Sequence, residues 1–75
     1  MPRIKDFGSF QIYMYFEDHG IPHFHVVAAG FYAAVAIEDL GVLAGELPPG
    51  VLRKVKKWAA GNRPLLRRKS SEYSE

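Results

Sequence analysis

The sequence predicts an α+β fold, in which an antiparallel meander of four to five strands is packed on one face by a C-terminal helix. Two observations lead to this prediction. The first half of the chain alternates apolar and polar residues with the period of two that half-buried strands show, whereas apolar residues after Pro49 recur at helical spacing. The 75 residues are expected to form a single domain, 1–75, and the absence of cysteine excludes a disulfide framework or a thiolate metal site.

Five segments separated by turn residues are expected to form the strands. Their approximate bounds are 3–7, 11–17, 23–28, 31–38 and 42–47. Gly20 and Pro22 favour a loop between the second and third strands, and Ala29-Gly30 favours a turn between the third and fourth. The residues Asp39-Leu40-Gly41 fit a three-residue hairpin loop in which Gly41 takes the left-handed conformation.

The residues that follow the last strand are expected to be helical. Pro48-Pro49 suits the first helical turn, where a missing N–H is harmless, and a helix over about 49–60 follows. Its apolar stripe consists of Val51, Leu52, Val55, Trp58 and Ala59. This helix is expected to be kinked or broken near 61–64, because Pro64 disfavours helical geometry at the residue before it. Leu65 and Leu66 then restart a short second helix or continue a kinked one.

Charge is divided unevenly along the chain. Residues 1–50 contain two basic and six acidic residues, a net charge of −4, whereas residues 51–75 contain eight basic and two acidic residues, a net charge of +6. Such a basic region attracts phosphates or an acidic protein, or it is the solvated side of a helix. If it binds a ligand, the expected contacts are Arg53, Lys57, Arg67 and Arg68.

The alternation also predicts which side chains share a face of the sheet. Pairing apolar residues across the strands places Tyr15 opposite His25, and His25 opposite Ala34. Ala34 is in turn expected opposite Glu46. The helix-covered face then holds Ile12, Met14, Phe16, Phe24, Val26, Phe31, Val35, Ile37 and Leu43. The other face holds Tyr13, Tyr15, His23, His25, Tyr32, Ala34, Ala36 and Glu46.

Three kinds of chemistry are open to the histidines. His23 and His25 project the same way from one strand, and His19 or Glu46 would add a third ligand for a divalent metal ion; no other cofactor is expected. As general acid and base, His23 and His25, with His19 as a further candidate, would suit cleavage of RNA. As part of a binding surface, they would lie among contact residues that also include Tyr13, Tyr15, Tyr32, Asp18 and Glu46.

Several stretches stand out together, namely Met1-Pro2-Arg3-Ile4, Ile12-Tyr13-Met14-Tyr15 and Asp18-His19-Gly20-Ile21-Pro22-His23-Phe24-His25-Val26. In these the chain resembles a family of small bacterial and archaeal proteins of unknown function, whose signature is Asp-His-x-Pro-Pro-His-Phe-His-Val. Ile21 stands at the first proline of that signature, and Gly61-Asn62-Arg63-Pro64 also departs from the family pattern. The resemblance continues through Gly41-Val42-Leu43 and Gly45-Glu46-Leu47-Pro48 to Val55 and Trp58.

The resemblance implies one half of a two-gene pair, in a toxin–antitoxin-like arrangement, or a regulator. The chain is therefore interpreted as a partner-binding module with a small protein partner and with RNA or DNA as a further ligand. The alternative is a histidine-based ribonuclease, with or without a metal. Exposed sheet edges suit a homodimer. No apolar run approaches the roughly 20 residues of a membrane span, and the N-terminus does not resemble a secretory signal, so a cytoplasmic protein without a membrane partner is expected.

Overall fold

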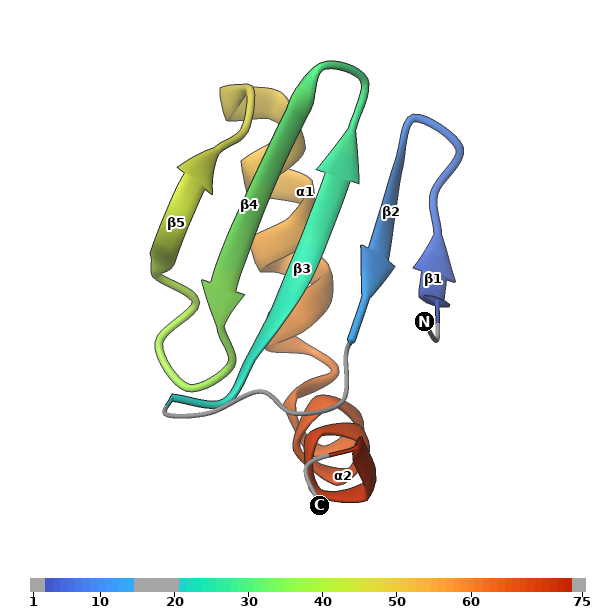
Figure 1. The fold of residues 1–75 in the computed structure, drawn as a ribbon, viewed down its shortest axis with the longest axis vertical. Coiled ribbons are helices and arrows are strands. Elements are labelled where there is room, and N and C mark those ends of the chain that lie inside the picture. The colour runs from blue at the N-terminus through green and yellow to red at the C-terminus, as the bar shows by residue number, and fades with distance from the viewer. Residues whose placement is uncertain (1–2, 15–20, 74–75) are drawn as a thin grey trace.

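The computed structural model describes residues 3–14 and 21–73, which form five strands and two helices (Figure 1). These elements are β1 (Arg3–Asp6), β2 (Phe10–Tyr13), β3 (His23–Ala28), β4 (Phe31–Ala36), β5 (Val42–Glu46), α1 (Pro49–Ala60) and α2 (Arg63–Tyr73). The sheet order is β1-β2-β3-β4-β5, and each strand is antiparallel to its neighbours. The predicted α+β class and the meander are therefore confirmed.

One face of this sheet is covered by α1, and α2 lies beyond the end of the sheet (Figure 1). The core between them consists of Phe10, Ile12, Met14, Phe24, Val26, Ala28, Val35, Ile37, Leu40, Val55, Ala59 and Leu66. Even-numbered residues of β2 and β3 point into this core, as the alternation predicts. Burial of one large apolar side chain contributes about 1.5–3 kcal/mol, so this shared layer holds the sheet and both helices together.

The pairing of β2 with β3 differs from the predicted register by two residues. Tyr13 lies opposite His25, in place of the predicted Tyr15. The difference follows from Phe10, which begins β2 opposite Ala28 and is only 1% exposed. This register places the Phe10 ring in the core. Because side chains alternate with a period of two, a shift of two residues leaves each described side chain of β2 on its predicted face.

The pairing of β3 with β4 agrees with the prediction. His25 lies opposite Ala34 and His23 opposite Ala36, and the two strands are joined through Ala29 and Gly30. Gly30 has a φ of +75°, a conformation that glycine adopts without steric cost. This hairpin places both imidazoles on the face of the sheet opposite α1.

The pairing of β4 with β5 is again displaced from the prediction. Glu46 lies opposite Tyr32 instead of Ala34, and a bulge interrupts the ladder next to Val35. Ile37 does not pair with β5, because β4 ends at Ala36 and the Ile37 N–H donates to the carbonyl oxygen of Pro22. Leu43 and Phe31, both predicted in the core, are 46% and 40% exposed.

A leucine, and not the predicted glycine, takes the left-handed conformation in the β4–β5 loop. Leu40 has a φ of +60°, while Gly41 does not have a positive φ. A left-handed residue with a side chain costs about 1–2 kcal/mol. The Leu40 side chain is 6% exposed and belongs to the core, and burying it contributes about 1.5–3 kcal/mol. Burial therefore offsets the backbone strain.

The helical region follows the prediction in its bounds and its break. Pro49 begins α1, and Val55 and Ala59 are its buried residues. The helix ends at Ala60, and Gly61 is its C-cap. Asn62 connects the two helices, because its side-chain amide donates to the carbonyl oxygen of Trp58 and its own carbonyl accepts the Leu66 N–H of α2. Leu66 is fully buried, so the break turns the chain and allows a second helix to reach the core.

Substitution of Gly45 is expected to destabilise the fold more than an equivalent change at Gly30. Both glycines have a φ of +75°, but a Cβ on Gly45 would lie 2.1 Å from the carbonyl oxygen of Tyr32, whereas a Cβ on Gly30 meets nothing within 4 Å. Gly30→Ala should cost about 1–2 kcal/mol, and Gly45→Ala about 3 kcal/mol or more, because β5 must move away from β4. Urea denaturation measures both; equal losses would contradict the predicted contact.

Candidate functional site

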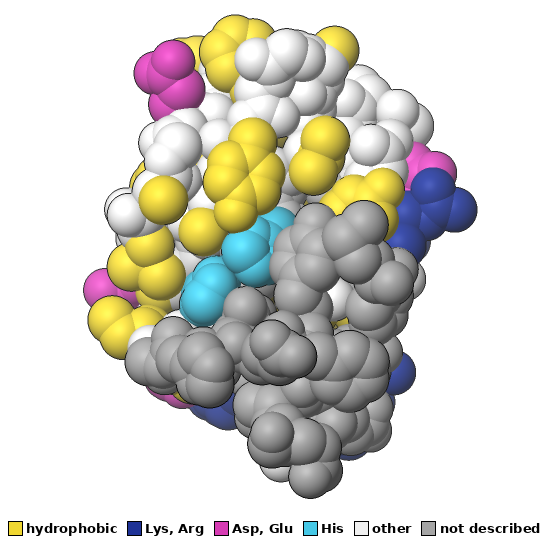
Figure 2. Space-filling model, in the orientation of Figure 1, with side chains coloured by type: hydrophobic (Ala, Val, Ile, Leu, Met, Phe, Trp, Pro, Cys, Tyr) yellow, Lys and Arg dark blue, Asp and Glu magenta, His cyan; other side chains and the backbone are white. Residues whose placement is uncertain are grey.

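The face of the sheet opposite α1 carries both described histidines. We refer to Tyr13, His23, His25, Tyr32 and Glu46 as the His/Tyr face. Figure 2 views the molecule from this side, and the two imidazoles lie next to each other near its centre, with apolar side chains beside them. Because Trp58 and α1 pack on the other side, the histidines are not part of the core beneath the helix.

His25 and Tyr32 orient each other. The His25 Nδ1 and the Tyr32 hydroxyl share a hydrogen bond of 2.7 Å, and the two rings are stacked with centroids 5.7 Å apart. His25 is only 9% exposed, whereas Tyr32 is 46% exposed. A buried imidazole thus orients a tyrosine ring that itself remains open to solvent.

His23 is oriented by the backbone. Its Nδ1 lies 2.7 Å from the carbonyl oxygen of Ile21, and a carbonyl can only accept, so Nδ1 carries the proton that is donated. In the neutral ring the lone pair is therefore on Nε2. The rings of His23 and His25 lie 4.9 Å apart at an angle of 70°. The arrangement provides a basic nitrogen on His23 beside a second imidazole that is coupled to a phenol.

Small residues make room for the two imidazoles. Ala34 and Ala36 lie opposite His25 and His23 on β4, and they are 6% and 4% exposed although α1 covers the other side of the sheet. Methyl side chains leave space for larger rings on the neighbouring strand. The two alanines therefore leave room for the imidazoles of the neighbouring strand.

The other predicted residues of this face are placed as follows. Tyr13 is half-buried opposite His25, and Glu46 is exposed opposite Tyr32. Tyr15, Asp18 and His19 lie outside the described residues. Within 3–14 and 21–73, no group of three or more His, Cys, Asp or Glu side chains could hold a metal ion, so Glu46 does not join His23 and His25 as a third ligand.

The predicted basic contacts lie on other elements. Arg53 and Lys57 are exposed on α1, whose packing face is directed to the opposite side of the sheet from the histidines, and Arg68 is exposed on α2. Arg67 forms a two-point ion pair with Glu38, with distances of 2.9 Å from Nε and 3.1 Å from Nη2. The hydrogen bonds and charge of Arg67 lower the pKa of Glu38, and Glu38 raises the pKa of Arg67. The His/Tyr face and the basic helix α1 therefore do not form one continuous surface.

The strand-by-strand interpretation missed an exposed apolar edge beside the His/Tyr face. All five residues of β5 are exposed, and Val42 and Leu43 are 40% and 46% exposed. The strand pairs with β4 and ends the sheet order. The sequence does contain an indication of this edge, namely the absence of lysine and arginine between Val42 and Glu46, because edge strands that avoid association usually carry such charges.

The fold and this face define a class, namely a small α+β protein with a five-stranded meander, one helix behind the sheet, a second helix beyond its end and a paired-histidine surface on the other face. Residues 9–69 match the family described as Domain of unknown function (DUF4160), and the chain belongs to that family. No curated protein and no solved structure matches the chain. Among the described residues, neither helix is long and apolar enough to cross a membrane.

Removing the Tyr32 hydroxyl is expected to loosen His25. Tyr32→Phe deletes the hydrogen bond to the buried Nδ1 and should lower the free energy of unfolding by about 1–2 kcal/mol. Nitrogen NMR of the imidazoles should show a changed Nδ1 shift for His25 and an unchanged one for His23, whose Nδ1 donates to the backbone of Ile21. Equal changes at both histidines, or none at His25, would contradict this geometry.

The ion pair of α2 should be visible in a titration. Because the pKa of Glu38 is lowered in the folded protein, the pair stabilises the fold above the unfolded pKa of Glu38, and this contribution is lost as pH falls through the folded pKa. Arg67→Gln should raise the Glu38 pKa and lower stability at neutral pH, and the difference should vanish in acid. Carboxyl NMR measures the pKa, and Arg68→Gln is the matched control; an equal shift in both variants would refute the assignment.

Proposed function

We propose that this protein is a small cytoplasmic module that binds a protein partner through the His/Tyr face and the adjacent β5 edge. In that role it would be one component of a toxin–antitoxin-like pair, or a regulator. The observation that carries the proposal is the exposure of the end strand β5, where Val42 and Leu43 are 40% and 46% exposed, next to the strand that presents the 46% exposed Tyr32 on the His/Tyr face. Large exposed apolar side chains along an open strand edge mark a surface that another molecule can cover.

The β5 edge suits a polypeptide partner. An end strand presents a row of backbone N–H and C=O groups, with which an extended segment can pair while its side chains meet alternate positions. Val42 and Leu43 would provide apolar contacts along that row. A second copy of the chain could use the same edge, so a homodimer and a heteromeric complex are both outcomes that a mass measurement in solution separates.

The histidines support this surface by orienting it. The hydrogen bond and the stacking with His25 restrict the Tyr32 ring before any partner arrives. Pre-organised aromatic side chains lose little conformational entropy on binding and are frequent among the residues that dominate interface energies. In this proposal His25 is a positioning residue, and Tyr32 makes the contact.

A protein partner is favoured over a nucleic acid by the distribution of charge. Affinity for RNA or DNA depends on lysine and arginine contacts to phosphates, and Arg53 and Lys57 lie on α1, on the other side of the sheet. On β1, Arg3 is paired with Asp6 at 3.3 Å. Contact of RNA or DNA with the basic helix would be a separate activity, and it would weaken steeply with added salt.

Acid–base chemistry is the second candidate, and the pairing of His23 with His25 favours it. A ribonuclease would use the Nε2 lone pair of His23 as base, with or without a divalent metal ion. The deep burial of His25 disfavours this function, since only 9% of that residue is exposed to a substrate. Partner binding therefore accounts for more of the exposed side chains of the His/Tyr face and the β5 edge than ribonuclease activity does.

The proposal predicts that Leu43→Asp weakens a complex with the product of the neighbouring gene. Inserting a charge into an apolar contact should reduce affinity at least about tenfold, measured by co-purification and by calorimetry. Ala60→Asp, an exposed substitution on α1, adds the same charge on the other side of the molecule and should have little effect. Equal affinity of the Leu43→Asp variant and the unchanged protein would overturn the assignment of this surface.

The ribonuclease alternative is tested on the same preparation. The protein is incubated with single-stranded RNA, with Mn²⁺ or with chelator, and the RNA length is followed. RNA that stays intact in both conditions supports the binding function. Turnover that His23→Asn removes, while the complex with the partner persists, would establish the enzyme instead.

A further inference from the structure

A groove on the other side of the molecule has the features of a second binding site. It has a volume of about 440 Å³ and lies between α1 and the turn that joins β1 to β2. Its lining consists of Phe7, Lys54, Lys57, Trp58, Gly61 and Asn62. Small-ligand and side-chain pockets commonly have volumes of about 300–1,000 Å³ and mostly apolar walls with a few polar groups.

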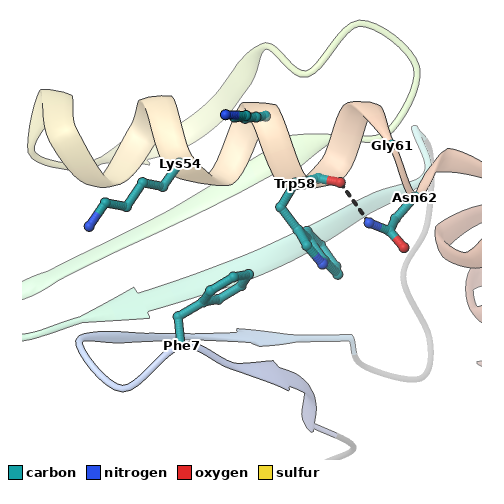
Figure 3. A pocket seen from close by; sticks show the side chains of 6 residues that line it. Phe7, Lys54, Trp58, Gly61 and Asn62 are labelled. Atoms are coloured by element: carbon teal, nitrogen blue, oxygen red, sulfur yellow. Dashed lines mark hydrogen bonds between the residues drawn. The ribbon is translucent and has the colours of Figure 1, made fainter.

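The apolar walls are two aromatic rings from distant parts of the sequence. Phe7 and Trp58 meet edge to face with centroids 5.9 Å apart (Figure 3). Phe7 is 36% exposed, and its neighbour Gly8 has a φ of +89° that allows the tight turn. The Gly8 N–H also donates to Asp6 Oδ1 at 2.8 Å, which further orders the turn beside Phe7. Each of the two rings is therefore positioned by the element that carries it, Trp58 by α1 and Phe7 by an ordered turn.

The polar part of the groove has one sign of charge. Lys54 and Lys57 are exposed on α1, and the lining includes no carboxylate. Neither ammonium forms an ion pair with a residue that the structure describes. Asp6, which precedes Phe7 in the sequence, forms an ion pair with Arg3 and accepts hydrogen bonds from Gly8 and Gln11. The groove thus combines aromatic walls with a positive rim that no carboxylate of its lining balances.

The surroundings of Phe7 favour an aliphatic side chain over a nucleic-acid base. Its ring is stacked on Phe10 with centroids 4.6 Å apart, and the Lys5 Nζ lies over the ring at 5.6 Å. The Phe7 ring thus already has a stacked aromatic neighbour and an ammonium group over it, and a base needs an open ring face on which to stack. An apolar side chain can instead contact the ring edges.

We propose that this groove binds an acidic segment of a partner protein, which packs a leucine-like side chain against the wall formed by Phe7 and Trp58 and places carboxylates beside Lys54 and Lys57. The site goes beyond the proposed function, because it lies on the α1 side of the sheet and shares no residue with the His/Tyr face. The protein would then have two binding surfaces with different chemistry, one apolar with an open strand edge and one aromatic with a cationic rim.

The experiment uses the only tryptophan in the chain, Trp58, as its reporter. The probe is the capped pentapeptide Glu-Glu-Leu-Glu-Glu, titrated to a few millimolar, a range that detects dissociation constants of about 1 mM. Binding should change the Trp58 emission and shift the amide resonances of Gly61 and Asn62. Peptides with alanine in place of leucine, or glutamine in place of every glutamate, should each bind at least about fivefold more weakly.

Matched variants locate the contact. Lys54→Gln with Lys57→Gln should weaken the probe about tenfold, whereas Arg53→Gln with Lys56→Gln removes the same charge from exposed positions of α1 outside the lining and should leave affinity nearly unchanged. Equal losses in the two double variants would show unspecific attraction and overturn the proposal. Absence of any response to the probe, or stronger quenching of Trp58 by adenosine monophosphate than by the peptide, would also overturn it.

The two binding proposals fail independently. Leu43→Asp should leave the pentapeptide affinity unchanged, because Leu43 is not part of the groove. Loss of the complex with the neighbouring gene product in Leu43→Asp tests the His/Tyr face alone, and loss of peptide binding in the Lys54/Lys57 variant tests the groove alone.

Discussion

The apolar layer between the sheet and the helices is the constraint on which the rest of the molecule depends. Phe24 and Val26 are fully buried on one side of β3, and the residues between and beside them must therefore point the other way. His23 and His25 are on the surface opposite α1 for this reason and not because of any interaction of their own. The break at Asn62 serves the same layer, since it lets Leu66 of α2 close the core at the end of the sheet.

This dependence explains which parts of the fold could be predicted. The alternation of β2 and β3 determines the faces, so an error of two residues in the register left Tyr13 on the correct side while changing its partner. The bounds of α1 followed from Pro49 and from the spacing of Val55 and Ala59. The face of the histidines was predicted for the same reason, and the near-complete burial of His25 was not, because burial depends on how neighbouring rings lie over it.

Features that depend on a close contact between distant parts of the chain could not be predicted from the sequence. The local sequence favours Gly41 over Leu40 as the left-handed residue, but the outcome depends on whether the Leu40 side chain reaches the core. The bulge next to Val35 and the approach of Gly45 to the Tyr32 carbonyl likewise arise from packing between two strands. These features moved Glu46 away from Ala34 and exposed Leu43, and so they changed the candidate site itself.

The basic and acidic parts of the sequence also occupy different parts of the folded molecule. The basic third of the sequence contributes most of α1 and all of α2, while Tyr13, His23, His25 and Tyr32 lie on strands from the acidic part. Arg67 is used within the molecule, by Glu38, whereas Lys54 and Lys57 line the groove beside Trp58 without such a partner among the described residues. A single sheet is thin enough that both of its sides are surface except where α1 covers it, so a chain of 75 residues can present two chemically distinct faces. In the two proposals made above, the His/Tyr face and the groove beside Trp58 share no residue, so occupation of one would leave the other accessible.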